Sequence, residues 1–284
     1  MSIIIEIAIG DAYGAGFEYS DPHFVQKNNN ASTYTQHPKW KSLAPGSYTD
    51  DTQMSLAIAE HMIHEKPWTA VALADSFVNT FKRDKREGYA RGFYEVLTRS
   101  LNGQDLLRIL NGHGTSDKSG GAMRAGVIGL YPTIDEVLEK SKIQASITHN
   151  SPDGIAAAQA SSLMVHYFHY DCGSKKNLGE FLETHVPGRW NQPWHGEVKS
   201  KGEMSVRAAI TAIQKHDTTS NILHACIAYT GDVDTVAAIA LGPASKSREI
   251  QQILPRSLYN NLENKKYGRD YLLEIDKQLL EHFK

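Results

Sequence analysis

Two short acidic motifs contain the residue types best suited to binding a metal ion. Asp50 and Asp51 lie in YTDDT, ahead of one apolar run, and Asp232 and Asp234 lie in YTGDVDT, ahead of another. Each motif begins with Tyr-Thr and ends with Thr. Carboxylate and hydroxyl oxygens are hard ligands that suit Mg²⁺ or Mn²⁺. The pattern therefore indicates metal chemistry at the start of two helices.

One motif of this kind, taken alone, has a second interpretation. Thr49 or Asp50 could cap a helix, because side-chain oxygens accept hydrogen bonds from the first backbone N–H groups and the N-terminus of a helix is positive. The presence of two motifs favours the metal. Four carboxylates in one pocket would repel one another strongly, and a pair of divalent cations would remove that cost.

The elements that would position these motifs are helices. Apolar residues recur at intervals of three and four, whereas the alternation typical of strands is scarce. Thr69 and the pair Ser151-Pro152 have the residue types of helix starts. The periodic stretches are 54–62, 74–81, 153–170, 206–213, 233–241 and 271–283. We therefore expect an all-α fold: residues 1–284 form a single domain, an orthogonal helical bundle with a dinuclear metal site between helix N-termini.

Two stretches, 111–126 and 171–203, lack helical periodicity and are rich in Gly and polar residues. Long irregular segments are often functional loops, although some are only connections. The first stretch is a candidate phosphate-binding loop, because closely spaced glycines let backbone N–H groups converge on an anion. A helix is predicted to follow it near Met123, where its N-terminus would add positive potential. The alternative is a plain flexible loop.

The composition excludes several classes of protein. The chain has 284 residues and a formal net charge of −2, so there is no clear nucleic-acid signal. Cys172 and Cys226 fit no zinc or redox spacing, and sparse cysteine suits a reducing compartment. The apolar start, MSIIIEIAIG, lacks a basic segment and is interrupted by Glu6. No apolar run is long enough to cross a bilayer. We therefore expect a cytoplasmic protein with no membrane partner.

Five stretches resemble, in the same order, the motifs of the ADP-ribosylglycohydrolase family, the DraG-type ADP-ribosyl-acceptor hydrolases. They are GDAYGAGFEY at 10–19, YTDDTQM at 48–54, GHGTSDKSGGAMRAG at 112–126, SITHNSP at 146–152 and TGDVDTVAAIALG at 230–242. The chain departs from the family pattern at three places. Thr230 stands where Gly is common, Ser119 stands where Asn is usual, and Pro243 is expected to end the last of these helices early.

The resemblance implies a hydrolase that uses two divalent cations, Mg²⁺ or Mn²⁺, to cleave the glycosidic bond between ADP-ribose and an acceptor. It implies that Glu18, Asp50 and Asp232 are catalytic, with Glu18 acting on the scissile bond or its water. The implied metal ligands are Thr49, Asp50, Asp51, Asp232, Asp234 and Thr235. The implied substrate-binding residues, from the glycine-rich loop and the TH segment, are Gly112, Gly114, Ser119, Gly120, Gly121, Met123 and His149.

The acceptor stays open at this point. The partner would be an ADP-ribosylated protein or a small-molecule ADP-ribose conjugate. We favour ADP-ribosylated arginine, because an acidic cleft suits a guanidinium leaving group, while serine, nucleic acid and O-acetyl-ADP-ribose are alternatives. An ADP-ribose-binding or immunity-type protein on the same scaffold is a further alternative. A phosphatase with a DxDxT nucleophile is disfavoured, because that motif follows a buried strand and the preceding NILHACIAYTG has a helical pattern.

Overall fold

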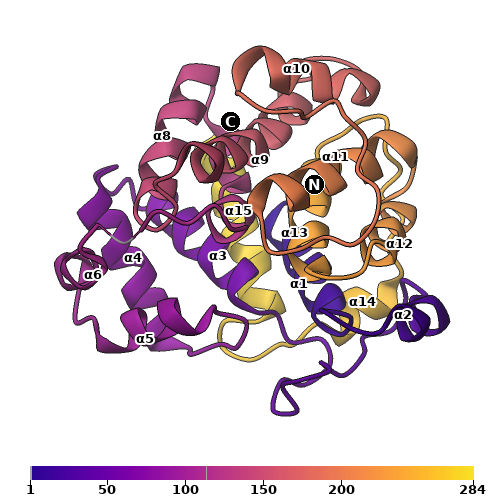
Figure 1. Cartoon of the computed structure of the whole chain (residues 1–284), viewed down its shortest axis with the longest axis horizontal. Coiled ribbons are helices and arrows are strands. Elements are labelled where there is room, and N and C mark those ends of the chain that lie inside the picture. The colour runs from indigo at the N-terminus through magenta and orange to yellow at the C-terminus, as the bar shows by residue number, and fades with distance from the viewer. Residues whose placement is uncertain (1, 113) are drawn as a thin grey trace.

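The predicted all-α architecture is confirmed by a computed structural model, which describes residues 2–112 and 114–284. These residues form fifteen α-helices and two 3-10 helices, and they contain no strand (Figure 1). The segment before DVDT is helix α12 (Thr219–Ala228), so the strand that a DxDxT phosphatase requires is replaced by a helix. Within the described residues, no helix is both long enough and apolar enough to cross a membrane.

The centre of the molecule is the pair of helices α1 (Ile4–Ala15) and α13 (Val233–Ala244). Every residue of both helices is buried, which explains why their sequences are apolar on all faces. Gly10 and Gly14 lie on the face of α1 that meets α13. A Cβ atom at Gly14 would lie 2.3 Å from the Cα of Asp234, and one at Gly10 would lie 2.6 Å from the carbonyl oxygen of Ala237. The two glycines therefore let the backbones of these helices touch.

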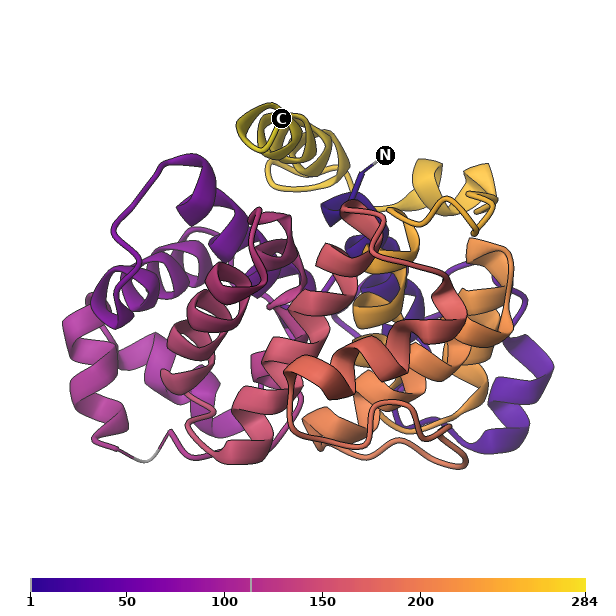
Figure 2. The same ribbon diagram turned by 90° about the horizontal axis from the view of Figure 1, so that it is seen from above.

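One side of this pair is formed by four helices, the first of which begins within the first acidic motif. They are α3 (Asp50–Ile63), α4 (Ala70–Arg83), α5 (Arg91–Arg99) and α6 (Gly103–Leu110) (Figure 1). The C-terminal helix α15 (Arg269–His282) packs on α1 and α3, beside the N-terminus (Figure 2). Asp276 of α15 accepts hydrogen bonds from the backbone N–H groups of Ile3, Ile4 and Ile5. The two ends of the chain are thus joined through a helix cap.

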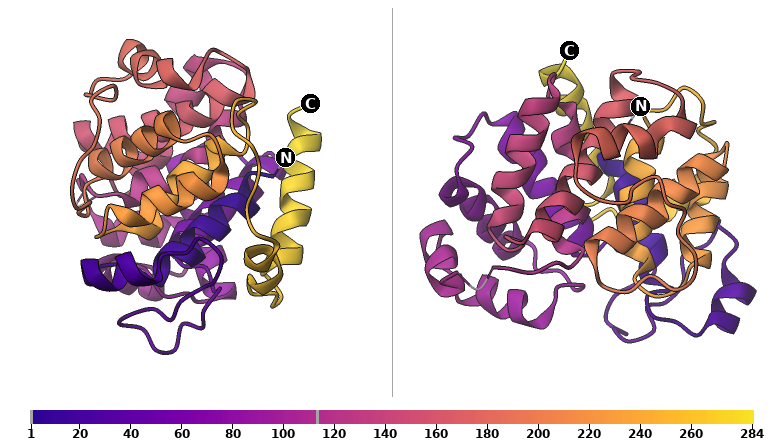
Figure 3. Two further views of the ribbon diagram at one scale, coloured as in Figure 1. Left: turned by 90° about the vertical axis from the view of Figure 1, so that its right-hand side faces the viewer. Right: turned by 45° about the horizontal axis from the view of Figure 1, so that its top comes forward.

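The other side is formed largely by the middle of the chain, and Figure 3 shows it from two directions. Helix α9 (Pro152–His169) packs on α13, on α11 (Gly202–Lys215) and on α8 (Ile134–Ser146). The remaining elements are α2 (Pro22–Asn28), α7 (Gly120–Met123), η1 (Gly126–Leu130), η2 (Lys175–Asn177), α10 (Leu178–His185) and α14 (Arg256–Asn261). One continuous hydrophobic core reaches from Ile3 to Leu279.

The predicted helix starts are confirmed where a side chain marks them. Thr69 accepts a hydrogen bond from the N–H of Ala72 at the start of α4, and Ser151 accepts one from Gly154 at the start of α9. Within 171–203, however, the expectation of irregular structure is wrong for residues 175–185, which form η2 and α10, and for 202–203, which begin α11. Elements η2 and α10 have 3 and 8 residues, too few for a helical period to emerge. Helix α13 includes Pro243 and ends one residue later, at Ala244.

The close approach of α1 and α13 gives a prediction about stability. Gly14→Ala would place a methyl group 2.3 Å from the Cα of Asp234, so the two helices must separate. We expect the free energy of unfolding to fall by about 1–3 kcal/mol, the usual cost of overpacking a core. Denaturant unfolding measures this change. The matched control is Gly126→Ala, whose Cβ would meet Val165 at an ordinary 3.7 Å. A Gly14→Ala protein as stable as the control would contradict the packing described.

Candidate metal centre and substrate cavity

The two acidic motifs, far apart in sequence, line the same cavity. This cavity has a volume of about 590 Å³ and lies where α3 and α13 begin. The residues singled out from the sequence that line it are Glu18, Asp50, Asp51, Gly114, Ser119, Gly120, Met123, His149, Asp232, Asp234 and Thr235. Thr49, Gly112 and Gly121 are not among its lining residues. The structure thus brings together most of the predicted site, including carboxylates from both motifs.

Three of the carboxylates form a compact group. Glu18, Asp232 and Asp234 each offer an oxygen, and these three oxygens lie within 4.8 Å of one another. Asp50 and Asp51 lie outside that group but face the same cavity. This spacing is short enough for one small cation to bind several carboxylates, because such ions take oxygen ligands at about 2–2.6 Å.

Two buried oxygens indicate a place for a positive ion. Within the described part of the chain, Asp51 Oδ1 and Asp234 Oδ1 are buried and have no hydrogen-bond partner. A buried carboxylate oxygen without a donor is costly, and native proteins rarely leave one. One of these oxygens comes from each motif. The donor set of carboxylates and hydroxyls therefore fits a divalent cation of the Mg²⁺ or Mn²⁺ type.

The electrostatics of the cavity agree with this assignment. Burial, followed by repulsion from neighbouring carboxylates, raises the pKa values of Asp50, Asp51 and Asp234 well above the usual range. Burial and then repulsion from Glu18 raise the pKa of Asp232 to about 6, although the Ser119 hydroxyl opposes the rise. Ser119 Oγ donates to Asp232 Oδ2 at 3.0 Å. A bound cation would reverse these shifts, because positive charge favours the ionised carboxylates.

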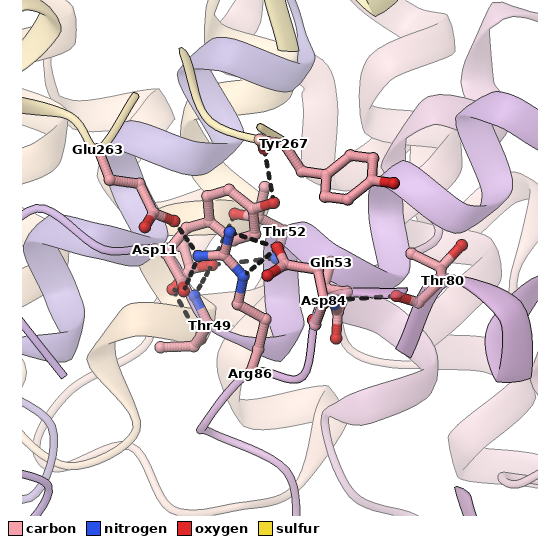
Figure 4. Close-up of polar contacts among 10 residues, drawn as sticks. Asp11, Thr49, Thr52, Gln53, Thr80, Asp84, Arg86, Glu263 and Tyr267 are labelled. Carbon is pink, nitrogen blue, oxygen red and sulfur yellow. Dashed lines mark hydrogen bonds and ion pairs between the residues drawn. The ribbon is translucent and has the colours of Figure 1, made fainter. Parts of the chain in front are cut away.

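Asp11 supports the first motif from behind (Figure 4). Its Oδ2 accepts hydrogen bonds from the backbone N–H groups of Thr49 at 2.9 Å and Thr52 at 3.0 Å. The hydroxyls of the same two threonines also donate to Asp11, at 2.7 and 2.6 Å. A carboxylate from α1 thus caps α3, while the Thr49 side chain accepts no capping hydrogen bond. This frees Asp50 and Asp51 from capping and leaves them for the cavity.

A buried guanidinium anchors the segment that precedes the motif (Figure 4). Arg86 binds the carboxylates of Asp84 and Glu263 and donates to the carbonyl oxygen of Tyr48. Its charged group lies 3.8 Å from the centre of the Tyr48 ring, and the Tyr48 hydroxyl donates to the carbonyl oxygen of Tyr267. Neither Arg86 nor Glu263 can be recognised from the sequence as part of this site, because no local spacing connects residues 86 and 263.

The loop between α4 and α5, which contains Arg86, also packs closely against Asp50. Gly88 has a φ of +104°, in the region that favours glycine, and a Cβ there would lie 2.1 Å from Asp50 Oδ1. Beyond it, Ala90, Phe93, Val96 and Leu110 line an apolar part of the cavity. These positions were also missed from the sequence, because they lie on the short helices α5 and α6 and in the preceding loop. The cavity thus joins an acidic end to an apolar wall.

The glycine-rich loop folds around His149. Thr115 forms an isolated β-bridge with His149, and Cβ atoms at Gly120 and Gly121 would lie 3.0 and 3.1 Å from the His149 side chain. Gly121 is thus packed behind this histidine, while Gly112 is exposed, with open space beside it. The expected helix after the loop is wrong in its extent: α7 has 4 residues and is followed by the separate 3-10 helix η1. Gly126 and Gly129 in this stretch favour the tighter, broken path.

His149 is a neutral ring with a defined orientation. Burial, and next the positive charge of Arg124, lower the pKa of His149 to about 3. The Thr148 hydroxyl accepts a hydrogen bond from Arg124 and lies 2.7 Å from His149 Nδ1. A hydroxyl has one proton and two lone pairs, so it can donate to Nδ1 while it accepts from Arg124. In that arrangement the proton of the neutral ring is on Nε2. His149 can thus present an N–H donor to a ligand in the cavity.

The two tryptophans of the second irregular stretch lie away from this cavity. Trp190 is buried and its indole N–H donates to the carbonyl oxygen of Val186. Trp194 is half-buried, and its indole N–H donates to the carbonyl oxygen of Gly196. Neither is a lining residue of the acidic cavity. Both positions agree with a role in covering the edge of the core.

Comparison with known proteins finds relatives that are named as ADP-ribosyl hydrolases. The chain is 27% identical to human ADP-ribosylhydrolase ARH3 over 232 residues, which are 72% of this chain and 63% of ARH3. It is 24% identical to the ADP-ribosyl-dinitrogen-reductase glycohydrolase of Rhodospirillum rubrum, over 84% of this chain and 82% of that protein. It is 22% identical to the ADP-ribosylarginine hydrolase Tri1 of Pseudomonas putida, over 84% of this chain and 67% of Tri1. The chain therefore spans less than two thirds of the length of human ARH3.

The fold and the family model agree with these relatives. A solved structure, described as an ADP-ribosylglycohydrolase-related protein complex, superposes with a TM-score of 0.73 at 18% identity, covering 100% of this chain and 97% of that one. Residues 7–284 match the family model described as ADP-ribosylglycohydrolase. The acidic cavity, the order of its motifs and this match lead to one conclusion: the chain belongs to the ADP-ribosylglycohydrolase family.

Proposed function

We propose that residues 1–284 form one ADP-ribosylglycohydrolase domain that hydrolyses the glycosidic bond between ADP-ribose and an acceptor. The observation that carries the proposal is the pair of unpartnered buried oxygens, Asp51 Oδ1 and Asp234 Oδ1, at one cavity in a chain of this family. Two divalent cations, Mg²⁺ or Mn²⁺, would bind these oxygens and neutralise the surrounding carboxylates. Their proposed ligands are Thr49, Asp50, Asp51, Asp232, Asp234 and Thr235.

Other residues of the chain would bind the substrate and transfer the proton during hydrolysis. When bound, the cations supply positive charge that orients ribose hydroxyls and an attacking water. Glu18 accepts a proton from that water as its oxygen bonds to the anomeric carbon, and the electron pair of the broken bond leaves with the acceptor. His149 Nε2–H donates to the ADP-ribose, and Gly114, Ser119, Gly120 and Met123 form the loop beside its diphosphate.

The acceptor that best suits this cavity is arginine on an ADP-ribosylated protein. A guanidinium carries positive charge, and Glu18, the carboxylate of the compact group that is not a proposed metal ligand, attracts it. It leaves as a neutral guanidine, so the site needs no strong acid to protonate the leaving group. One relative, Tri1, is named for activity on ADP-ribosylarginine. Serine, nucleic acid and O-acetyl-ADP-ribose remain the competing acceptors to be compared in the same assay.

The direct test is turnover on defined substrates. Peptides that carry ADP-ribose on arginine or on serine, and O-acetyl-ADP-ribose, are incubated with the protein plus Mg²⁺, Mn²⁺ or a chelator. We expect release of ADP-ribose from the arginine peptide with metal and none with chelator. Asp50→Asn and Asp232→Asn should each lower turnover by more than about 100-fold, since each removes the charge of a carboxylate proposed to bind the metal and to take part in catalysis.

The exposed carboxylate of Asp135, in the first turn of α8, provides the matched control. Asp135→Asn should leave turnover unchanged. Release that is independent of metal, or unaffected by Asp50→Asn and Asp232→Asn, would refute the proposed site. Tight binding of ADP-ribose without release from any substrate would instead identify an ADP-ribose-binding protein on this scaffold.

A second prediction separates metal binding from stability. Because burial raises the pKa of Asp234, its charged form opposes folding, and that cost grows as the pH rises from the usual pKa of an aspartate to the raised pKa of the folded protein. In metal-free buffer at pH 7.5, Asp234→Asn should therefore raise Tm, by about 2–4 °C if 1 kcal/mol is relieved. Added Mg²⁺ should raise the Tm of the unsubstituted protein, but not that of Asp234→Asn. A variant that is less stable without metal, or that still responds fully to Mg²⁺, would show that Asp234 is not a ligand.

A further inference from the structure

A histidine outside all the motifs contacts the carboxylate of Glu18. His37 lies in the segment between α2 and α3, and it is only 2% exposed. Its ring packs against Trp40, with ring centres 4.3 Å apart, and its Nε2 atom lies 2.8 Å from Glu18 Oε2. The carboxylate that this buried ring contacts is one of the residues that line the acidic cavity.

The hydrogen bonds of the ring define where its proton lies. His37 Nδ1 accepts the backbone N–H groups of Lys39 at 3.0 Å and Trp40 at 3.1 Å. A ring nitrogen that accepts two hydrogen bonds carries no proton, so the proton of the ring is on Nε2. His37 therefore donates to Glu18. It does so as a neutral group, which adds no positive charge to compete with a cation in the cavity.

The backbone places Glu18 where it needs such a support. The next residue, Tyr19, has a φ of +48°, and its N–H donates to the carbonyl oxygen of Gly231 at 2.8 Å. This contact holds Glu18 beside the second acidic motif, where it repels the carboxylates of Asp232 and Asp234. A flexible glutamate would turn away from such neighbours. The hydrogen bond from His37 holds Oε2 and leaves Oε1 for the cavity.

We propose that His37 is a positioning residue for Glu18. Its Nδ1 is fixed by the turn at residues 37–40, its Nε2–H fixes the carboxylate, and the carboxylate is held toward the reacting atoms despite its acidic neighbours. The expected effect on kcat rests on the proposed hydrolase function. The tautomer of His37 and its hydrogen bond to Glu18 do not depend on that function.

Two substitutions distinguish the contributions of the two ring nitrogens, Nδ1 and Nε2. The side-chain oxygen of asparagine can take the place of Nδ1, so His37→Asn keeps the acceptor for the turn and loses the donor to Glu18. The longer amide of glutamine reaches the place of Nε2, so His37→Gln keeps the donor and loses the acceptor. We expect His37→Asn to lower kcat by about 10- to 100-fold, as when a group that orients an active-site ligand is removed.

The pattern across the two variants decides between the roles. On the substrate that the unsubstituted protein hydrolyses, KM should change little in either variant, and kcat of His37→Gln should stay within threefold of the original value. If His37→Asn retains full kcat, or if both variants lose kcat together with Tm, His37 has only a structural role in the loop and the inference is overturned.

A spectroscopic measurement tests the inference without turnover. Histidine ¹⁵N NMR of the full chain with Mg²⁺ should show His37 protonated at Nε2 and unprotonated at Nδ1, with its Nε2 signal displaced in Glu18→Gln. A proton on Nδ1, or a signal unaffected by Glu18→Gln, would overturn the proposal. If the unsubstituted protein hydrolyses no ADP-ribosyl substrate, the proposed function fails, and the NMR result still decides the role of His37.

Discussion

The burial of several carboxylates in one cavity is the constraint on which the rest of the site depends. Asp51 and Asp234 are buried and Asp50 is half-buried. Removal from water and mutual repulsion favour the protonated forms of all three. Only protons or cations relieve that cost, because charge is poorly screened away from water. Asp232 is supported by a neutral donor, the Ser119 hydroxyl, which adds no positive charge beside this carboxylate. The site thus keeps its negative charge available for ions.

Helix α1 is the part of the fold that holds the two motifs together. Asp11 on this helix binds the start of α3 through four groups of Thr49 and Thr52. Gly14, three residues later, lets α1 touch the backbone of α13 at Asp234. One helix therefore contacts both acidic motifs through adjacent parts of its surface. The glycines and the aspartate of GDAYGAG serve this geometry, and the same segment continues to Glu18.

The sequence was sufficient for the parts of this arrangement that have a local pattern. Helical periodicity and caps such as Thr69 predicted the main helices, and two similar acidic motifs predicted a shared cavity. The parts that were missed depend on contacts between distant residues. Arg86 meets Glu263, and His37 meets Glu18, through loops whose paths no periodicity specifies. Gly112 was assigned to the phosphate loop by glycine spacing and by the family resemblance, and in the structure it is exposed, with open space beside it.

Locating bound ions tests the proposed dinuclear metal centre without any substrate. Crystals grown with Mn²⁺ can be measured by anomalous scattering, which identifies the metal without reference to activity. We expect two Mn²⁺ peaks inside the cavity, bounded by oxygens of Asp51 from the first motif and Asp234 from the second. A cavity without manganese, at Mn²⁺ concentrations that fill other sites on the protein, would contradict it.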